Sequence, residues 1–162
     1  MGTTRRHCLA LAIGAALVTS AKAAEPTVVS LGTATPGGGF PLYGEAFAAA
    51  INASDSTLAI TPRNTRGSSE NVPLLESGAL DLALVQGEAA YEALNGIGRS
   101  KADLRILSAM YSSPGMFAVR ADSPAQTISD LVGKPVAFGA AGSGLVILAR
   151  YVLDGIGLDM NR

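Results

Sequence analysis

The sequence predicts an α/β fold in which a mainly parallel sheet is flanked by helices. Two observations carry this prediction. Strand-like and helix-like segments alternate between residues 27 and 94, in the order β-α-β-α-β-α. In addition, an apolar run leads into a Gly/Ser-containing loop and then into a helix three times, over residues 31–40, 64–71 and 138–145. We expect all three loops at the carboxyl ends of strands, where sheets of this kind bind ligands.

The first residues have the pattern of a secretory signal peptide. Arg5 and Arg6 give a positive start, residues 8–18 are apolar, and a small-x-small pattern ends at Ala23. The apolar stretch is shorter than the ~20 residues that span a bilayer. We therefore expect residues 1–23 to be cleaved near Ala23, which makes the mature protein periplasmic. General secretion is favoured, and the paired arginines leave twin-arginine export open.

Cleavage at this point removes His7 and Cys8, which are the only histidine and the only cysteine of the chain. The mature chain then lacks the side chains required for disulfides, Cys/His zinc sites, Ser-His-Asp hydrolysis and Cys-His catalysis. We expect no catalytic residue, no metal site and no cofactor. The net charge of the whole chain is −1, and its aromatic residues are scattered, so nucleic acid is not an expected partner.

The first strand and helix are predicted from residue type and spacing. Residues 27–32 are a short β-branched run and read as a strand, and residues 34–39 form the loop after it. A helix over residues 40–51 follows, with Pro41 in its first turn, where proline is tolerated. Its apolar stripe comprises Phe40, Tyr43, Phe47, Ala50 and Ile51.

The second strand is predicted over residues 58–64, and a short helix follows it. Ser68 or Ser69 is the expected N-cap of this helix, because a serine hydroxyl can accept a bond from a free amide of the first turn. Glu70 then lies in the first turn, where the helix dipole favours a negative charge. Pro73 is expected to keep the helix short, with its end near Gly78.

The third repeat of the strand and helix pattern is predicted from residues 80–86, which read as a strand, and residues 88–94, which read as a helix. Residues 95–101 are a polar loop, residues 104–111 are a further apolar run, and residues 116–120 read as another strand.

A domain boundary is expected over residues 121–126, which are polar and contain a proline. A short helix over residues 129–132 and a strand over residues 135–139 follow. The last helix begins behind Gly144 and ends at Gly155 and Gly157. Its expected apolar face comprises Leu145, Leu148, Val152, Leu153 and Ile156.

The predicted domains are unequal in size. Residues 24–120 supply one nearly complete lobe, whereas residues 121–162 supply one strand and two helices, which are too few to bury a core. We expect the second segment to be the beginning of a second lobe, truncated within it.

Each of the three loops leads into a helix start, where unpaired N–H groups and the peptide dipoles attract carboxylates or phosphates. Arg66 adds a planar fork that suits a carboxylate, although a solvated loop arginine is the alternative. The glycines can also serve simple turns, and Tyr43 can belong to the core. The candidate ligand-binding residues are Gly37, Gly38, Gly39, Phe40, Tyr43, Arg66, Gly67, Ser68, Ser69, Gln86, Gly142, Ser143 and Gly144.

Several spaced motifs resemble the TAXI family, whose members are the extracytoplasmic solute-binding subunits of TRAP transporters. The motifs are Gly37-Gly38-Gly39-Phe40-Pro41-Leu42-Tyr43, the run from Asn64 to Gly78, Asp81-Leu82-Ala83-Leu84-Val85-Gln86, the run from Ser129 to Lys134, and Gly139-Ala140-Ala141-Gly142-Ser143-Gly144. They occur in order along essentially the whole mature chain.

This resemblance implies a two-lobed, type II periplasmic-binding-protein-like fold about twice as long as this chain. It also implies that a small anionic or zwitterionic solute, a carboxylate or an amino acid such as glutamate, is delivered to a TRAP membrane permease. The chain departs from the family pattern at Leu145, where a threonine is usual, and at Arg66, where a glycine is frequent. Both departures leave the identity of the solute open.

Two other classes of function stay open at this level. An exported enzyme acting on small anionic substrates would need a carboxylate base, for which Glu45, Glu70, Glu88 and Asp122 are the candidates. A periplasmic ligand-binding module that signals to a membrane sensor would use the same loops without a permease.

Overall fold

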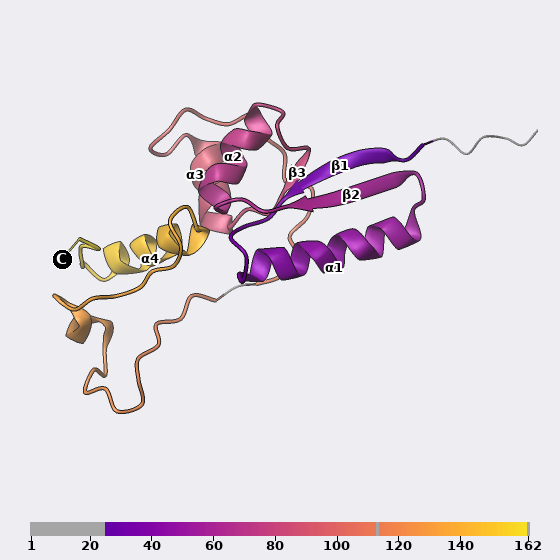
Figure 1. Cartoon of the computed structure of the whole chain (residues 1–162). Coiled ribbons are helices and arrows are strands. Elements are labelled where there is room, and N and C mark those ends of the chain that lie inside the picture. Colours follow the sequence, from indigo (N-terminus) through magenta and orange to yellow (C-terminus); the bar gives the residue numbers. More distant parts are fainter. Residues whose placement is uncertain (1–24, 113, 162) are drawn as a thin grey trace, which may run out of the picture.

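The structure is a computed structural model that describes residues 25–112 and 114–161 (Figure 1). The signal peptide predicted for residues 1–23 lies outside the described residues. The elements alternate as the sequence predicts, and the α/β fold with a parallel sheet flanked by helices is confirmed. Their bounds are β1 Thr27–Gly32, α1 Gly39–Ser54, β2 Leu58–Arg63, α2 Ser68–Glu76, β3 Leu82–Ala83, α3 Gly87–Asn95, the 3₁₀ helix η1 Ile128–Leu131, and α4 Gly144–Gly155.

The three strands form one parallel sheet with the order β2-β1-β3. β1 pairs with β2 along its whole length, from Thr27 opposite Leu58 to Gly32 opposite Arg63. The pairing of β3 covers only two positions of β1, at its carboxyl end. Because all strands run in the same direction, their carboxyl ends meet at one edge, and α1, α2 and α3 begin there.

β3 is shorter than the predicted strand over residues 80–86, and side-chain bonds at Asp81 account for its late start. The Asp81 carboxylate accepts a bond of 2.8 Å from the backbone N–H of Ser30 and one of 2.6 Å from its hydroxyl. The backbone N–H of Asp81 in turn donates to the Ser30 hydroxyl at 3.0 Å. Side-chain oxygens thus replace ladder bonds at this end of the strand.

These bonds make the stability of the sheet dependent on pH. The Ser30 hydroxyl and then its backbone N–H lower the pKa of Asp81. A carboxylate with a lowered folded-state pKa stabilises the fold above its unfolded pKa of about 3.9, and this contribution is lost as pH falls through the folded-state pKa. We expect Asp81→Asn to lower the urea midpoint at pH 7, and the difference from the wild type to narrow below pH ~4. Asp103→Asn, at an exposed surface pair with Arg105, is the control and should leave the midpoint nearly unchanged.

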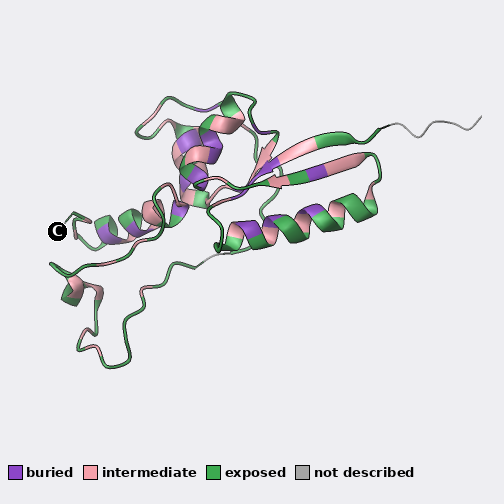
Figure 2. Ribbon diagram, in the orientation of Figure 1, coloured by how far each residue is buried: buried purple, intermediate pink, exposed green. Residues whose placement is uncertain are grey.

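The main core lies between the sheet and α1, which covers one face of β1 and β2 (Figures 1 and 2). The apolar stripe predicted for α1 is confirmed except at Ala50, which is exposed, while Ala48 is buried in its place. A Cβ added at Gly44 would lie 2.6 Å from the Thr33 methyl group, so the absence of a side chain lets α1 approach the sheet closely. The core comprises Leu31, Ala48, Ile60 and Leu84, with Val29, Phe40, Tyr43, Phe47, Ile51 and Leu82 packed against it.

A second, smaller core joins α2 and α3. Val72 of α2 and Ala93 of α3 are buried there with Ala102 from the loop that follows α3. Gly96 is the C-cap that follows helix α3, and it has the left-handed conformation with φ 70°. It belongs to the polar loop predicted over residues 95–101. The loop that follows α3 is joined to this helix by a hydrogen bond of 2.8 Å from the N–H of Ala102 to the Ala93 carbonyl.

The expected N-cap of α2 is wrong. Gly67 occupies the N-cap with a positive φ of 112°, which a serine adopts only with strain. The helix therefore begins one residue earlier than a Ser68 cap requires and two residues earlier than a Ser69 cap requires. Glu70 does lie in the first turn, and the helix ends at Glu76, close to the predicted end. Pro73 lies inside this nine-residue helix.

The strands predicted over residues 116–120 and 135–139 do not form. A strand requires the backbone of a neighbour, and the described residues give neither segment a pairing partner. Met116 is 84% exposed, so its apolar character does not place it in a core. Figure 2 shows that the chain between α3 and α4 is largely exposed. A prediction from apolar runs alone therefore gives more strands than the described residues form.

The last helices agree with their predicted positions, with one exception in packing. η1 covers Ile128–Leu131 and carries a capping box between Thr127 and Asp130. In α4, Leu153 is buried, whereas Leu145 and Ile156 are exposed, so the predicted apolar face is wrong at both of its ends. Among residues 25–112 and 114–161, no helix has the length and apolar composition that crossing a bilayer requires.

Candidate functional site

The α2–α4 junction, defined by residues 66–69 and 142–144, brings together two of the three Gly/Ser loops. A Cβ added at Gly67 would lie 3.1 Å from the Gly142 carbonyl oxygen, and one added at Gly142 would lie 3.0 Å from Arg66 Cβ. Both glycines have positive φ, at 112° and 89°. The N–H of Ser69 donates to the Gly142 carbonyl at 3.1 Å. Glycine is required on both sides because the two backbones touch.

The start of α3 joins the same junction through Gln86. A Cβ added at Gly144 would lie 2.3 Å from Gln86 Cβ and 2.8 Å from the Ser68 hydroxyl oxygen. The backbone N–H of Gln86 donates to that hydroxyl at 3.0 Å, and the Ser68 side chain is fully buried. Gln86 is also the N-cap of α3. The starts of α2, α3 and α4 therefore meet around Ser68, Gln86 and Gly144.

Ser143 has a structural role as the N-cap of α4, where its hydroxyl accepts a bond of 3.2 Å from the N–H of Leu145. This bond satisfies one of the amides that a helix start leaves unpaired. Ser69, by contrast, is exposed at the junction, so its hydroxyl is accessible.

Arg66 lies at the rim of the junction with its side chain 76% exposed. The Glu70 carboxylate accepts a bond of 2.6 Å from the backbone N–H of Arg66 and lies 3.5 Å from its Nε. The backbone bond is the main cause that lowers the pKa of Glu70, and the arginine charge adds to it. Glu70 thus fixes the backbone of the loop, while the guanidinium stays accessible to an anion.

The third Gly/Ser loop, at residues 37–39, contacts other partners. Gly38 is the N-cap of α1, and its N–H donates to the Thr35 carbonyl at 3.1 Å. A Cβ at Gly39 would lie 3.7 Å from the Tyr111 hydroxyl. The rings of Tyr43 and Tyr111 are 5.0 Å apart between centroids. This loop therefore adjoins an aromatic pair, while Phe40 and Tyr43 also pack on the main core.

Buried polar side chains tie these loops to the edge of the sheet, and the sequence analysis missed them. Thr33, the residue after β1, accepts bonds through its carbonyl from the Thr65 hydroxyl at 3.1 Å and from the Asn71 amide at 2.8 Å. The same amide donates to the Leu84 carbonyl at 2.8 Å. Ser68, Asn71 and Val72 lie on the same face of α2, because residues three or four positions apart in a helix are neighbours. This helical spacing is the sequence signal that could have indicated the burial of Asn71.

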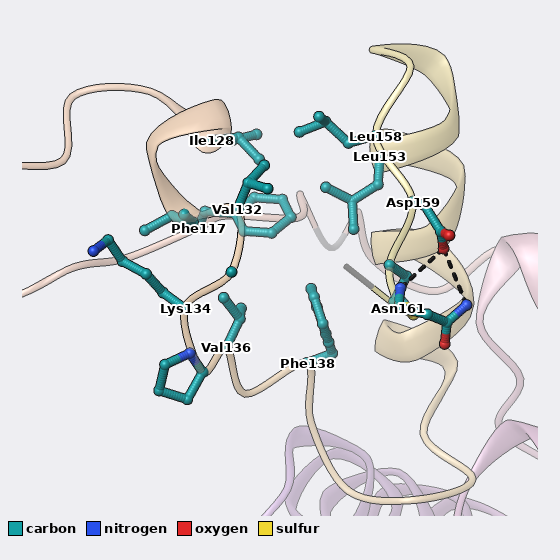
Figure 3. A pocket seen from close by; sticks show the side chains of 14 residues that line it. Phe117, Ile128, Val132, Lys134, Val136, Phe138, Leu153, Leu158, Asp159 and Asn161 are labelled. Atoms are coloured by element: carbon teal, nitrogen blue, oxygen red, sulfur yellow. Dashed lines mark hydrogen bonds between the residues drawn. The ribbon is translucent and has the colours of Figure 1, made fainter.

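A cavity of the described part of the chain adjoins the predicted site and is larger than a second one near the C-terminal helix. It has a volume of about 670 Å³ and includes Phe40, Gln86 and Tyr111 in its lining. The smaller, of about 400 Å³, lies between η1 and α4 and contains none of the predicted residues (Figure 3). Its apolar wall includes Val136 and Phe138, so the apolar residues of the predicted strand over residues 135–139 line a cavity instead of a sheet.

The charges and dipoles at the junction are of the kind that suits an anion. Three helix starts direct partial positive charge toward the same small region, and each is worth roughly 0.3–2 kcal/mol to an anion. Arg66 supplies a full positive charge beside them. Among residues 25–112 and 114–161, no group of three His, Cys, Asp or Glu side chains is placed to hold a metal ion.

A comparison with protein families matches residues 31–162 of the chain to the model of the NMT1-like family. The chain belongs to the NMT1-like family. NMT1-like proteins are periplasmic-binding-protein-like, so the predicted solute-binding role outside the cytoplasm is confirmed at this level. Binding proteins of this kind in general carry out no reaction, and they work with a membrane transporter. The assignment of this NMT1-like chain to the TAXI family, and its solute, stay predictions.

Proposed function

We propose that the protein captures a small anionic or zwitterionic solute, a carboxylate or an amino acid, and delivers it to a TRAP-type membrane permease as a TAXI-family subunit. The meeting of the starts of α2, α3 and α4 beside Arg66 carries this proposal. Such an arrangement favours a negative charge without a metal or a cofactor. Export by the predicted signal peptide at residues 1–23 places the protein where the permease can receive the solute.

In this proposal, the anionic group binds at the α2–α4 junction. The Arg66 guanidinium forms two hydrogen bonds with a carboxylate, and the exposed Ser69 hydroxyl provides a further donor. The turn of residues 142–144 closes over the group from the other side, and Gln86 contributes an amide. The loop of residues 37–39, with Phe40 and Tyr43, borders the remainder of the solute.

Magnitudes explain why contributions from two segments are required. A micromolar dissociation constant corresponds to a binding free energy of about 8 kcal/mol. One helix start contributes roughly 0.3–2 kcal/mol to the binding of an anion, and one charged hydrogen bond contributes about 1.5–3 kcal/mol. Residues 25–120 acting as one lobe supply Arg66 and the starts of α1, α2 and α3. Residues 121–161, as the opening of a second lobe, supply α4. Closure of the two around the solute adds their contributions and excludes water.

The test is the affinity of an Arg66→Ala variant for L-glutamate and for glutarate, measured by isothermal titration calorimetry. We expect binding of both to weaken about 10- to 100-fold, because charged hydrogen bonds worth about 1.5–3 kcal/mol are lost. Arg120→Ala is the matched control, since Arg120 is exposed and paired with Asp122. Equal affinities of the Arg66→Ala variant and the wild type would remove Arg66 from the site.

A further inference from the structure

An ion pair joins α3 to α4, away from the loops of the α2–α4 junction. Arg150 of α4 donates to the Glu92 carboxylate of α3. The Glu92 side chain is only 15% exposed and that of Arg150 is 47% exposed, so the pair is partly withdrawn from water. The guanidinium also lies 5.6 Å from the ring centroid of Tyr151. Salt therefore screens this pair less than it screens a fully exposed one.

The same two helices also touch at their starts. There, a Cβ added at Gly144 would lie 2.3 Å from Gln86 Cβ. Glu92 follows Gln86 by six residues, and Arg150 follows Gly144 by six residues. At a rise of about 1.5 Å per residue, the ion pair lies about 9 Å further along each helix. Helix α4 consequently contacts α3 at two separate points (Figure 1), which fix its direction where a single point would allow it to pivot.

The direction of α4 decides where the turn of residues 142–144 lies, because Gly144 is the first residue of this helix. The Gly142 carbonyl in the turn accepts a bond from the Ser69 N–H at the start of α2. A rotation of α4 away from α3 would move the turn off the junction. Glu92 and Arg150 belong to none of the junction loops, so an effect of the pair on the solute passes through the position of the turn.

We propose that the Glu92–Arg150 pair positions the turn of residues 142–144 over the junction and so sets the affinity for the solute without touching it. This inference rests on the proposed function, because it takes the solute to bind between that turn and Arg66. The pair favours the arrangement in which α3 and α4 lie together, and in that arrangement both segments of the chain contribute to binding. Both residues are thus positioning residues.

The experiment reverses the charge of one partner and then of both. Calorimetry on the full chain measures the affinities for L-glutamate and glutarate. We expect Glu92→Arg, which places two like charges together, to weaken both about tenfold. Glu92→Arg/Arg150→Glu restores opposite charges and should recover most of the loss. Without solute, the amide hydrogens of α4 should exchange faster in the single variant and at the wild-type rate in the double variant.

The sign of the effect separates position from general electrostatics. Glu92→Arg makes the protein more positive, which by itself favours the binding of an anion. Glu76→Arg is the matched control, because it makes the same change of charge and breaks a similarly exposed pair with Arg99, outside α4 and the junction. This control should neither weaken binding nor change exchange in α4. If Glu92→Arg does not fold, Glu92→Gln replaces it, with an expected loss of about threefold.

The outcomes separate the two proposals. Unchanged affinity in Glu92→Arg would overturn this inference and leave the proposed capture of carboxylates standing. A loss that the reversed pair does not recover would also overturn it, because the loss would then not come from the pair. Binding of neither probe by the wild type would overturn the proposed capture, and the inference with it. Melting curves verify that each variant is folded.

Discussion

Replacing Asn71 with alanine should lower the free energy of unfolding by about 2–4 kcal/mol. The side chain is fully buried, and its amide donates to the carbonyls of Thr33 and Leu84, at the carboxyl ends of β1 and β3. The variant leaves the Leu84 carbonyl without this donor inside the protein, whereas the Thr33 carbonyl keeps its bond from Thr65. The loss of two buried hydrogen bonds and the new void both destabilise the fold. Urea denaturation monitored by circular dichroism measures the change.

Asn95→Ala provides the matched control for this prediction. Asn95 is exposed at the end of α3, and its amide donates only within its own helix, to the Tyr91 carbonyl at 2.8 Å. Its replacement should change the free energy of unfolding by less than about 1 kcal/mol. If the two variants were equally stable, Asn71 would not hold α2 to the sheet in the way the buried bonds indicate.

Gly144→Ala is expected to separate the start of α4 from α2 and α3 and to weaken solute binding at least about tenfold, which is ~1.4 kcal/mol. The added Cβ would lie 2.3 Å from Gln86 Cβ, which cannot move without its backbone, and 2.8 Å from the Ser68 hydroxyl oxygen, which is buried and bonded to the Gln86 N–H. Helix propensity favours alanine over glycine by up to ~1 kcal/mol, so it predicts the opposite sign. Calorimetry measures the affinity, and amide hydrogen exchange shows whether α4 loosens.

Gly155→Ala tests the same substitution at the other end of the same helix. A Cβ at Gly155 meets nothing within 4 Å, so the variant should bind solute as the wild type does. Tight binding by Gly144→Ala, with unchanged exchange in α4, would show that the close packing at the junction is unnecessary for capture.

Local patterns were sufficient to predict the first part of the fold. β1, α1 and β2 are each long enough for their periodicity to show, and their bounds match the prediction within a few residues. Glycine and proline marked most of the ends correctly, as at Gly96 and Pro41. These signals depend only on neighbours in the sequence, which is why a single sequence reveals them.

Features that depend on distant neighbours could not be predicted in the same way. The apolar residues at 116–120 and 135–139 are typical of strands, but pairing requires an adjacent backbone that composition does not specify. The cap of α2 was misplaced because Gly67 has a positive φ and lies against Gly142, which is 75 residues away in the chain.

The sequence indicated the individual loops of the candidate site, but it did not indicate how these loops contact one another. The glycines at 67, 142 and 144 were chosen as points of approach for a ligand, whereas in the structure they first permit the approach of backbone to backbone. Asn71 is important because its side chain is buried, and this burial follows from tertiary packing and not from any short motif.

The hydrogen bond from Ser69 to the Gly142 carbonyl means that the protein supplies its own acceptor to the amide at the start of α2. An anion that takes this amide must displace that carbonyl, so two acceptors compete for one proton. The incoming carboxylate is charged and the carbonyl is neutral, so the amide forms the stronger hydrogen bond with the solute. The affinity of any anion at this position is therefore a net quantity, reduced by the cost of breaking the internal bond. The same bond shields the amide from water whenever the solute is absent.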